Sequence, residues 1–323
     1  MVEAIGRRRA ICIMAAAAGL PLLPFAGSAE AGIEPVVWRG QALGAPATLI
    51  LNIDDKVLAR RLINRVVAEV ARLESIFSLY KDGSTLRELN KVGALASPPF
   101  EMVALLEACR SVWDASGGAF DPTIQPLWML YAQHFSSPGA DPAGPERQAL
   151  DAVLSRVGFD GVRFNRDRIA FARPEMALSF NGIAQGYVTD RIVDLLREAG
   201  MTSSLVNMGE NRAIGAQADG RPWRIGLAEM ETGSAPDTIL EIVNKAVSTS
   251  SASGFHFDPA ARFGHILDPR RGNVPPLYRR MSVIAPDATT ADAMSTAFSL
   301  MKPEAIQSFL QLHPEIAVDM VAG

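Results

Sequence analysis

Strand patterns follow one another through the middle of this chain with few helices between them. Apolar residues alternate with polar ones over short runs, and the run at 161–172 carries a turn at residues 165–167. Further runs cover residues 177–180, 203–208, 223–228, 238–244 and 245–251. Strands that alternate with helices build a doubly wound sheet, whereas grouped strands build an α+β fold. The sequence therefore predicts an α+β fold with mixed or antiparallel sheets flanked by helices.

Helical periodicity marks the segments on either side of these strands. Two strand patterns at 36–53, separated by Gly and Pro residues, lead into a helix over residues 56–78. A second helix covers about residues 100–115 and ends at a pair of glycines, which favour helix ends. Helices are also predicted at 146–157 and 187–200, with a surface loop at 136–145.

The first 31 residues have the pattern of an export signal. Three arginines, at positions 7–9, precede a short apolar stretch, and small residues at Ala29 and Ala31 form an A-x-A cleavage pattern. Pro21 and Pro24 interrupt the stretch, which is also short for a bilayer span. We expect cleavage after Ala31 and a periplasmic location for residues 32–323, reached by the Sec or the twin-arginine route.

The net charge, the cysteines and the histidines argue against two kinds of function, nucleic-acid binding and a soft-metal site. The formal net charge of −4 gives no electrostatic footprint for nucleic acid, so a nucleic-acid partner is not expected. Signal cleavage removes Cys12 and leaves Cys109, which lies in an apolar helical pattern typical of a buried structural cysteine. The four histidines lack zinc-ligand spacing, so a soft-metal site is not expected either. A hard cation held by oxygen ligands stays open.

A carboxylate and a hydroxyl lie one helical turn apart in the segment TTADAMST at 289–296. Asp292 and Thr296 share a helix face, so both side chains can point at one small hard cation. The alternative is an ordinary helix start, with Thr289 or Thr290 as the cap and Asp292 near the positive end of the helix dipole. Taken alone, the segment favours the helix start.

Polar loops offer further candidate sites, each with a structural alternative. In GAFDPT, Pro122 holds Asp121 extended, where it can accept from ribose or ring N–H groups or form an Asx turn. NGIAQG, at 181–186, is either a close approach of a ligand to the main chain or a tight turn. GHILDPRRG, at 264–272, is either a loop that brings an imidazole near a phosphate or a solvated turn.

The order of these segments along the chain is more specific than any one of them. From Glu74 to Met301 the chain carries, in order, ESIFSLYKDGSTLRELN, GAFDPTIQPLW, NGIAQGYVTDRIVDLL, SLVNMGENRAIG, STSS, GHILDPRRG and TTADAMSTAF. This order resembles the ApbE family, the FAD:protein FMN transferases. The form NGIAQG is similar to the branch of that family that accompanies nitrous oxide reductase maturation. The resemblance implies an ApbE-like, T-fold-like architecture over residues 32–323.

The resemblance also implies a reaction and a set of residues for it. Members of the family use Mg²⁺ and take FAD as substrate, transfer FMN to a threonine hydroxyl of an acceptor protein, and release AMP. By similarity, Asp292, Thr296 and the main-chain carbonyl of Gly182 are the metal ligands. His265 is the candidate general base, with Asp268 or a metal-bound water as alternatives. The acceptor implied is a periplasmic or membrane redox protein, such as a membrane-bound flavoprotein of nitrous oxide respiration.

The family pattern maps its FAD contacts onto both aromatic and polar positions. Tyr80 would stack on a flat ring and Asp121 would accept hydrogen bonds, although Tyr80 and Phe120 are equally compatible with roles as core aromatics. The complete set of implied contacts is Tyr80, Ala119, Phe120, Asp121, Gln185 and Ile266.

Several positions depart from the family pattern. Ser179, Phe180 and Asn181 precede Gly182 where the family often has Asp-Leu-Gly-Gly, and Gln185 replaces a lysine, so one carboxylate and one cation are lost together. Glu210 and Ser251 each stand where a glycine is expected, and Leu-Gly-Ala at 43–45 stands for Met-Gly-Thr. Two other functions therefore stay open beside transfer. They are a periplasmic protein that binds FAD without transferring FMN, and a Mg²⁺-dependent pyrophosphatase that hydrolyses FAD to FMN and AMP.

Overall fold

A computed structural model describes residues 34–228 and 236–323. The predicted export signal at 1–31 lies outside the described residues. Within the two described ranges, each helix is too short or too polar to cross a bilayer.

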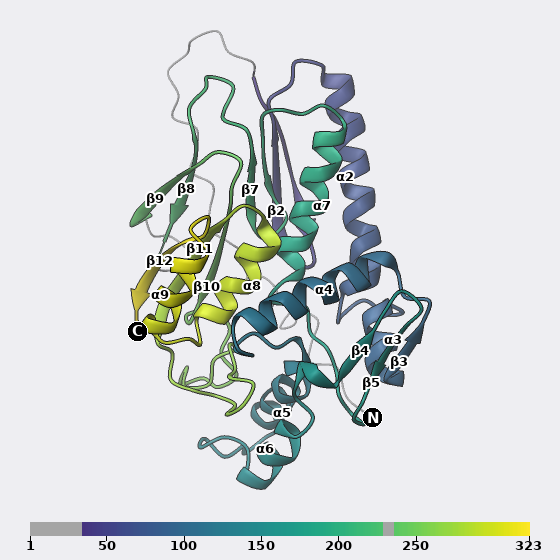
Figure 1. Cartoon of the computed structure of the whole chain (residues 1–323), viewed down its shortest axis with the longest axis vertical. Coiled ribbons are helices and arrows are strands. Elements are labelled where there is room, and N and C mark those ends of the chain that lie inside the picture. The colour runs from purple at the N-terminus through teal and green to yellow at the C-terminus, as the bar shows by residue number, and fades with distance from the viewer. Residues whose placement is uncertain (1–33, 229–235) are drawn as a thin grey trace.

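One antiparallel sheet organises the molecule (Figure 1). Its seven strands lie in the order β1-β2-β6-β7-β10-β11-β12, and every neighbouring pair is antiparallel. The strands are β1 Val36–Ala42, β2 Ala45–Leu51, β6 Ser204–Asn207, β7 Asn211–Ile214, β10 Ala246–Ser251, β11 Tyr278–Ala285 and β12 Ala317–Ala322. The predicted α+β fold with antiparallel sheets is confirmed.

Helices cover one face of this sheet and a hairpin covers the other. The helices are α2 (Lys56–Phe77), α4 (Phe100–Ala115), α7 (Ala184–Glu198) and α8 (Ala288–Phe298). Along β2, Leu49 and Leu51 join the core beneath the helices, while Ile50 packs in a second core with Trp223. This alternation follows from the two-residue period of a strand. Trp223 belongs to the hairpin of β8 (Trp223–Leu227) and β9 (Thr238–Ile242).

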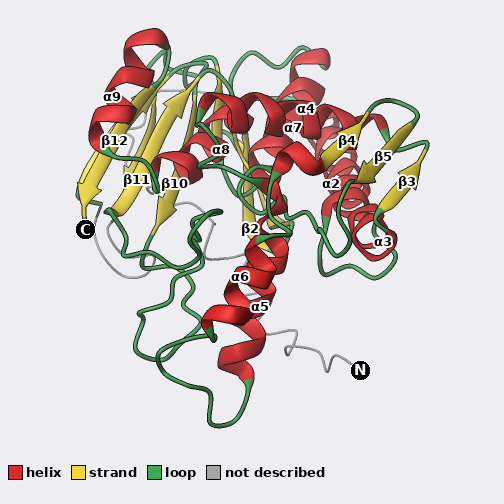
Figure 2. Ribbon diagram, turned by 60° about the horizontal axis from the view of Figure 1, so that its bottom comes forward, coloured by secondary structure: helices red, strands yellow, loops and turns green. Residues whose placement is uncertain are grey.

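Two smaller units complete the fold (Figure 2). One is a three-stranded sheet in the order β3-β5-β4, beside α3 (Thr85–Val92), with β3 at Ala94–Ala96, β4 at Val162–Phe164 and β5 at Arg168–Phe171. The other, which we call the aromatic unit, packs α5 (Gln125–Ser136) and α6 (Arg147–Leu154) against the loop at 255–267. At the C-terminal end, α9 (Pro303–Leu312) precedes β12.

The predicted strand at 177–180 is not a strand. Leu178 forms both of its main-chain hydrogen bonds with the Asn90 side chain, at 2.7 Å and 2.8 Å, and the Ser179 N–H donates to the Pro122 carbonyl. The apolar run is extended and buried, as its composition indicates. However, the Asn90 side chain and the Pro122 carbonyl form the hydrogen bonds that a neighbouring strand would otherwise form. Both partners are distant in the sequence and reach this segment only in the folded protein.

Candidate active site

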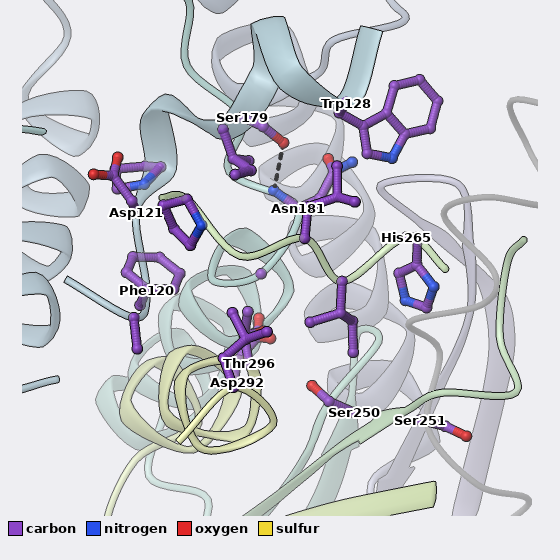
Figure 3. A pocket seen from close by; sticks show the side chains of 18 of the residues that line it. Phe120, Asp121, Trp128, Ser179, Asn181, Ser250, Ser251, His265, Asp292 and Thr296 are labelled. Carbon is purple, nitrogen blue, oxygen red and sulfur yellow. Dashed lines mark hydrogen bonds between the residues drawn. The ribbon is translucent and has the colours of Figure 1, made fainter. Parts of the chain in front are cut away.

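A pocket opens where α8, the 119–122 turn, the segment before α7 and the 264–269 loop meet (Figure 3). It encloses about 920 Å³ of space that protein atoms do not fill, part of it open to solvent. Eight of the ten residues implied by the family resemblance line it, namely Ala119, Phe120, Asp121, Gly182, His265, Ile266, Asp292 and Thr296. Residues as far apart in the chain as Ala119 and Thr296, 177 positions, therefore share one cavity.

Helix α8 begins one residue before the segment that the sequence singled out. Its cap is Asp287, whose side chain accepts from the Thr290 N–H, so neither Thr289 nor Thr290 is the cap. Asp292 consequently lies in the second turn, where the helix dipole contributes little. The side chain is 4% exposed and accepts from the Gly186 N–H at 2.9 Å. Asp292 is thus a buried carboxyl at the pocket wall rather than an ordinary helix-start residue.

Burial raises the pKa of Asp292 to about 7, opposed by the Gly186 hydrogen bond and reinforced by the negative charge of Asp190. A carboxyl in this setting is held neutral by a proton or stabilised as an anion by a cation. Thr296, one turn further along α8, projects beside it in Figure 3.

The start of α8 is held by a carboxylate from α7. Asp190 accepts from the Ala288 and Thr289 N–H groups, both at 2.8 Å, and from the Thr289 hydroxyl. Arg212 on β7 pairs with the same carboxylate at 2.5 Å. Burial nevertheless raises the pKa of Asp190, against the opposing effects of Arg212 and these hydrogen bonds. This network fixes the position of α8 and hence of Asp292 and Thr296.

Two glycines allow the segment around the start of α7 to approach α8. A Cβ on Gly182 would lie 2.8 Å from the Thr296 Oγ1, and a Cβ on Gly186 would lie 2.2 Å from the Ala288 carbonyl oxygen. The main chain at Gly182 therefore lies against the Thr296 hydroxyl.

A carboxylate, a hydroxyl and a nearby main-chain carbonyl are all hard oxygen donors, so these residues fit Mg²⁺. Within the described residues there is no cluster of three or more His, Cys, Asp or Glu suited to a metal. The donor set thus resembles an oxygen site in which water or substrate oxygens complete the coordination.

His265 lies across the cavity from α8 (Figure 3). Its Nδ1 is 2.9 Å from the Phe255 carbonyl oxygen. A carbonyl only accepts hydrogen bonds, so Nδ1 carries the proton and Nε2 keeps a lone pair. Burial lowers the pKa of His265, and the hydrogen bond to Phe255 opposes that effect. The imidazole is therefore neutral at pH 7 and able to accept a proton through Nε2.

Asp121 lines the pocket, but its carboxylate already accepts four hydrogen bonds. Oδ1 accepts from the N–H and the hydroxyl of Thr123, and Oδ2 accepts from Trp113 Nε1 and the Phe159 N–H. Burial raises the pKa of Asp121 against these hydrogen bonds. Of the two alternatives from the sequence, the structure shows the Asx-type turn, which lies at the pocket wall, and the role of Asp121 as an FAD contact stays a prediction.

Asp268, the alternative base, holds its own loop together. Its carboxylate accepts from the N–H groups of Arg270 and Arg271 and from the Arg271 guanidinium, at 2.7 Å to 3.1 Å. Asp268 is not among the residues that line the pocket, so the geometry favours His265 as the base.

Two implied FAD contacts, Tyr80 and Gln185, are not among the residues that line the pocket. Tyr80 is 38% exposed and its hydroxyl interacts with the Asn181 side chain, which does line the cavity. Gln185 is 4% exposed, and a Cβ on Gly209 would lie 2.5 Å from its side-chain amide carbon. Its Oε1 has no hydrogen-bond partner among the described residues. Both positions support the wall, and their assignment as FAD contacts stays a prediction.

Glu210 lines the pocket, although sequence reasoning assigned it no role beyond a departure from glycine. It lies in the turn between β6 and β7 and is 2% exposed. The available signal was the polar loop GENRAIG at a strand end, which is where ligands often meet a sheet. Trp128, Thr249 and Ser250 line the pocket as well.

Fold and site together define a protein with an oxygen-rich, cation-compatible pocket and a neutral histidine. The ApbE family model matches residues 43–320, so the chain belongs to the ApbE family.

Curated relatives and solved structures agree with this family. The chain is 25% identical to the FAD:protein FMN transferase of Klebsiella pneumoniae (strain 342), with 85% of this chain and 78% of that one covered. The Treponema pallidum (strain Nichols) protein of the same name is 28% identical, with coverage of 79% and 75%. The apo crystal structure of the Pseudomonas stutzeri flavinyl transferase ApbE superposes with a TM-score of 0.76 at 27% identity, covering 90% of this chain and 92% of that one.

Proposed function

We propose that this chain is an exported, Mg²⁺-dependent enzyme that transfers the FMN half of FAD to a threonine hydroxyl of an acceptor protein and releases AMP. The observation that carries the proposal is the convergence of Asp292, Thr296 and Gly182 in one pocket with a histidine whose Nε2 is free to accept a proton. Membership of the ApbE family and the names of the relatives support the same reaction.

The reaction is a displacement at the phosphorus that belongs to FMN. The threonine oxygen forms a new P–O bond there while the bond to the bridging oxygen breaks, and AMP leaves with that oxygen and its electrons. His265 Nε2 accepts the proton of the threonine hydroxyl. Asp292, Thr296 and the Gly182 carbonyl would hold Mg²⁺, which when bound offsets the charge that develops on the diphosphate.

The N-terminal pattern supports a periplasmic location, and the acceptor is accordingly a periplasmic or membrane redox protein. The form NGIAQG favours, as the acceptor, a membrane-bound flavoprotein of nitrous oxide respiration.

The test uses purified protein with FAD, Mg²⁺ and a candidate acceptor domain. A fluorescent flavin band on the acceptor that survives a denaturing gel supports transfer, whereas bound flavin that never becomes covalent supports the FAD-binding alternative. AMP release without an acceptor supports the pyrophosphatase. The Asp292→Ala variant should lose Mg²⁺-dependent AMP release while staying folded, and a wild-type rate in it would remove the metal assignment.

A further inference from the structure

Glu210 and Asp292 are two buried carboxyls on one cavity. They are 2% and 4% exposed, and no residue lining the pocket is Lys or Arg. Arg212, the buried arginine nearest to Glu210 in the sequence, forms an ion pair with Asp190, with 2.5 Å between the Arg212 Nη1 and the Asp190 Oδ1. Two neighbouring buried carboxyls without a cation are costly, because desolvation and mutual repulsion both oppose ionisation.

The contacts of Glu210 leave one oxygen unsatisfied. The Ser248 side chain and the Thr249 backbone hydrogen bond to its carboxyl group. Its Oε2 is buried and has no partner among the described residues. Glu210 and Asp292 both line the same cavity. The charge of Asp292 adds to burial in raising the pKa of Glu210. An orphaned buried oxygen in a native site calls for an unseen partner.

We propose that Glu210 is a further oxygen donor to the divalent cation held by Asp292 and Thr296, so that the protein binds this cation in the absence of FAD. The inference rests on the proposed function, because it extends the same cation site. A site with one carboxylate, one hydroxyl and one carbonyl supplies a single negative charge, so the substrate must neutralise the rest of a divalent cation's charge. A second carboxylate neutralises a divalent ion within the protein, and the number of charged ligands strongly tunes affinity.

The experiment measures Mn²⁺ binding, by electron paramagnetic resonance of free Mn²⁺, to the metal-free full-length mature protein without FAD. Glu210→Gln keeps the size of the side chain and an acceptor for Ser248 but removes the negative charge. We expect Mn²⁺ affinity to fall at least about tenfold in this variant, and to fall likewise in Asp292→Asn. Glu241→Gln, an exposed position on β9, is the matched control for charge and should bind like the wild type.

The outcomes separate this inference from the proposed function. Mn²⁺ affinity of Glu210→Gln within about twofold of wild type, with affinity lost in Asp292→Asn, overturns the role of Glu210 and leaves the transferase intact. Flavin transfer that is unaffected by chelators, together with no Mn²⁺ binding by the wild type, overturns both. If Glu210→Gln does not fold, a Mn²⁺-soaked crystal of the wild type decides. An anomalous peak in direct contact with the Glu210 carboxylate supports the inference, and a peak that contacts only Asp292 and Thr296 overturns it.

Discussion

At the scale of single residues, His265 combines a fixed tautomer with a lowered pKa. We expect His265→Asn to reduce the rate of flavin transfer by about a hundredfold to ten-thousandfold, the range for loss of a general base. FAD binding, followed by flavin fluorescence, should change little. Because the neutral imidazole is the active form and burial lowers its pKa, wild-type activity should hold at neutral pH and decline only in acid. An unchanged rate of flavin transfer in the variant would mean that another group is the general base.

The buried carboxyl of Asp292 gives a second prediction, for the metal-free protein. Its pKa rises from 3.8 to about 7 on folding, so the folded state binds the proton more tightly. The stability from this group is complete below the unfolded value and is lost as pH rises towards about 7. We expect chelated wild type to lose up to about 1.4 kcal/mol of unfolding free energy per pH unit across that window relative to Asp292→Asn. Denaturant unfolding at several pH values tests this, and parallel curves for the two proteins would refute it.

At the scale of elements, the junction of α7 and α8 is fixed by Asp190. Asp190→Ala removes three acceptor contacts at the start of α8 and leaves Arg212 buried without its partner. We expect the unfolding free energy to fall by about 3 kcal/mol, the scale for breaking a buried ion pair. Asp194→Ala, on the same helix with a half-exposed pair to Arg191 at 3.5 Å, is the control and should cost under about 1 kcal/mol. Equal losses of unfolding free energy in the two variants would show that the contacts of Asp190 with α8 do not stabilise the protein more than an exposed ion pair does.

At the scale of the whole molecule, the site is assembled from separate units. Asp292 and Thr296 come from a helix against the large sheet, whereas His265 comes from the loop of the aromatic unit. Trp128, at 9% exposure, lines the pocket and packs against Phe255, whose carbonyl oxygen fixes the imidazole.

We therefore expect Trp128→Ala to disturb the base and to leave the cation site intact. The rate of transfer should fall, and stability should fall by about 3 kcal/mol from the lost aromatic packing. Mn²⁺ affinity should stay within about twofold of wild type, which an equilibrium titration measures. A parallel loss of Mn²⁺ binding would mean that the two halves of the site are one structural unit.

The family, the α+β class and most of the helices and strands could be predicted from the amino-acid sequence alone. These follow from local periodicity, turn residues and the order of motifs, all of which are readable without knowing which segments touch. The spacing of Asp292 and Thr296 also placed both on one helix face, as the structure shows. The export signal and the assigned roles of the site residues stay predictions.

The contacts and burial of each of those side chains could not be predicted, because they depend on segments that meet only in the folded protein. Gly186 and Asp292 meet although they are 106 residues apart, and no local pattern encodes that contact. The same long-range packing brings the Phe159 N–H to the Asp121 carboxylate, buries Gln185 against Gly209, and places Glu210 and Asp292 on one cavity. Burial and charge depend on neighbours from distant segments, and these neighbours are brought together only when the sheet and its helices have packed.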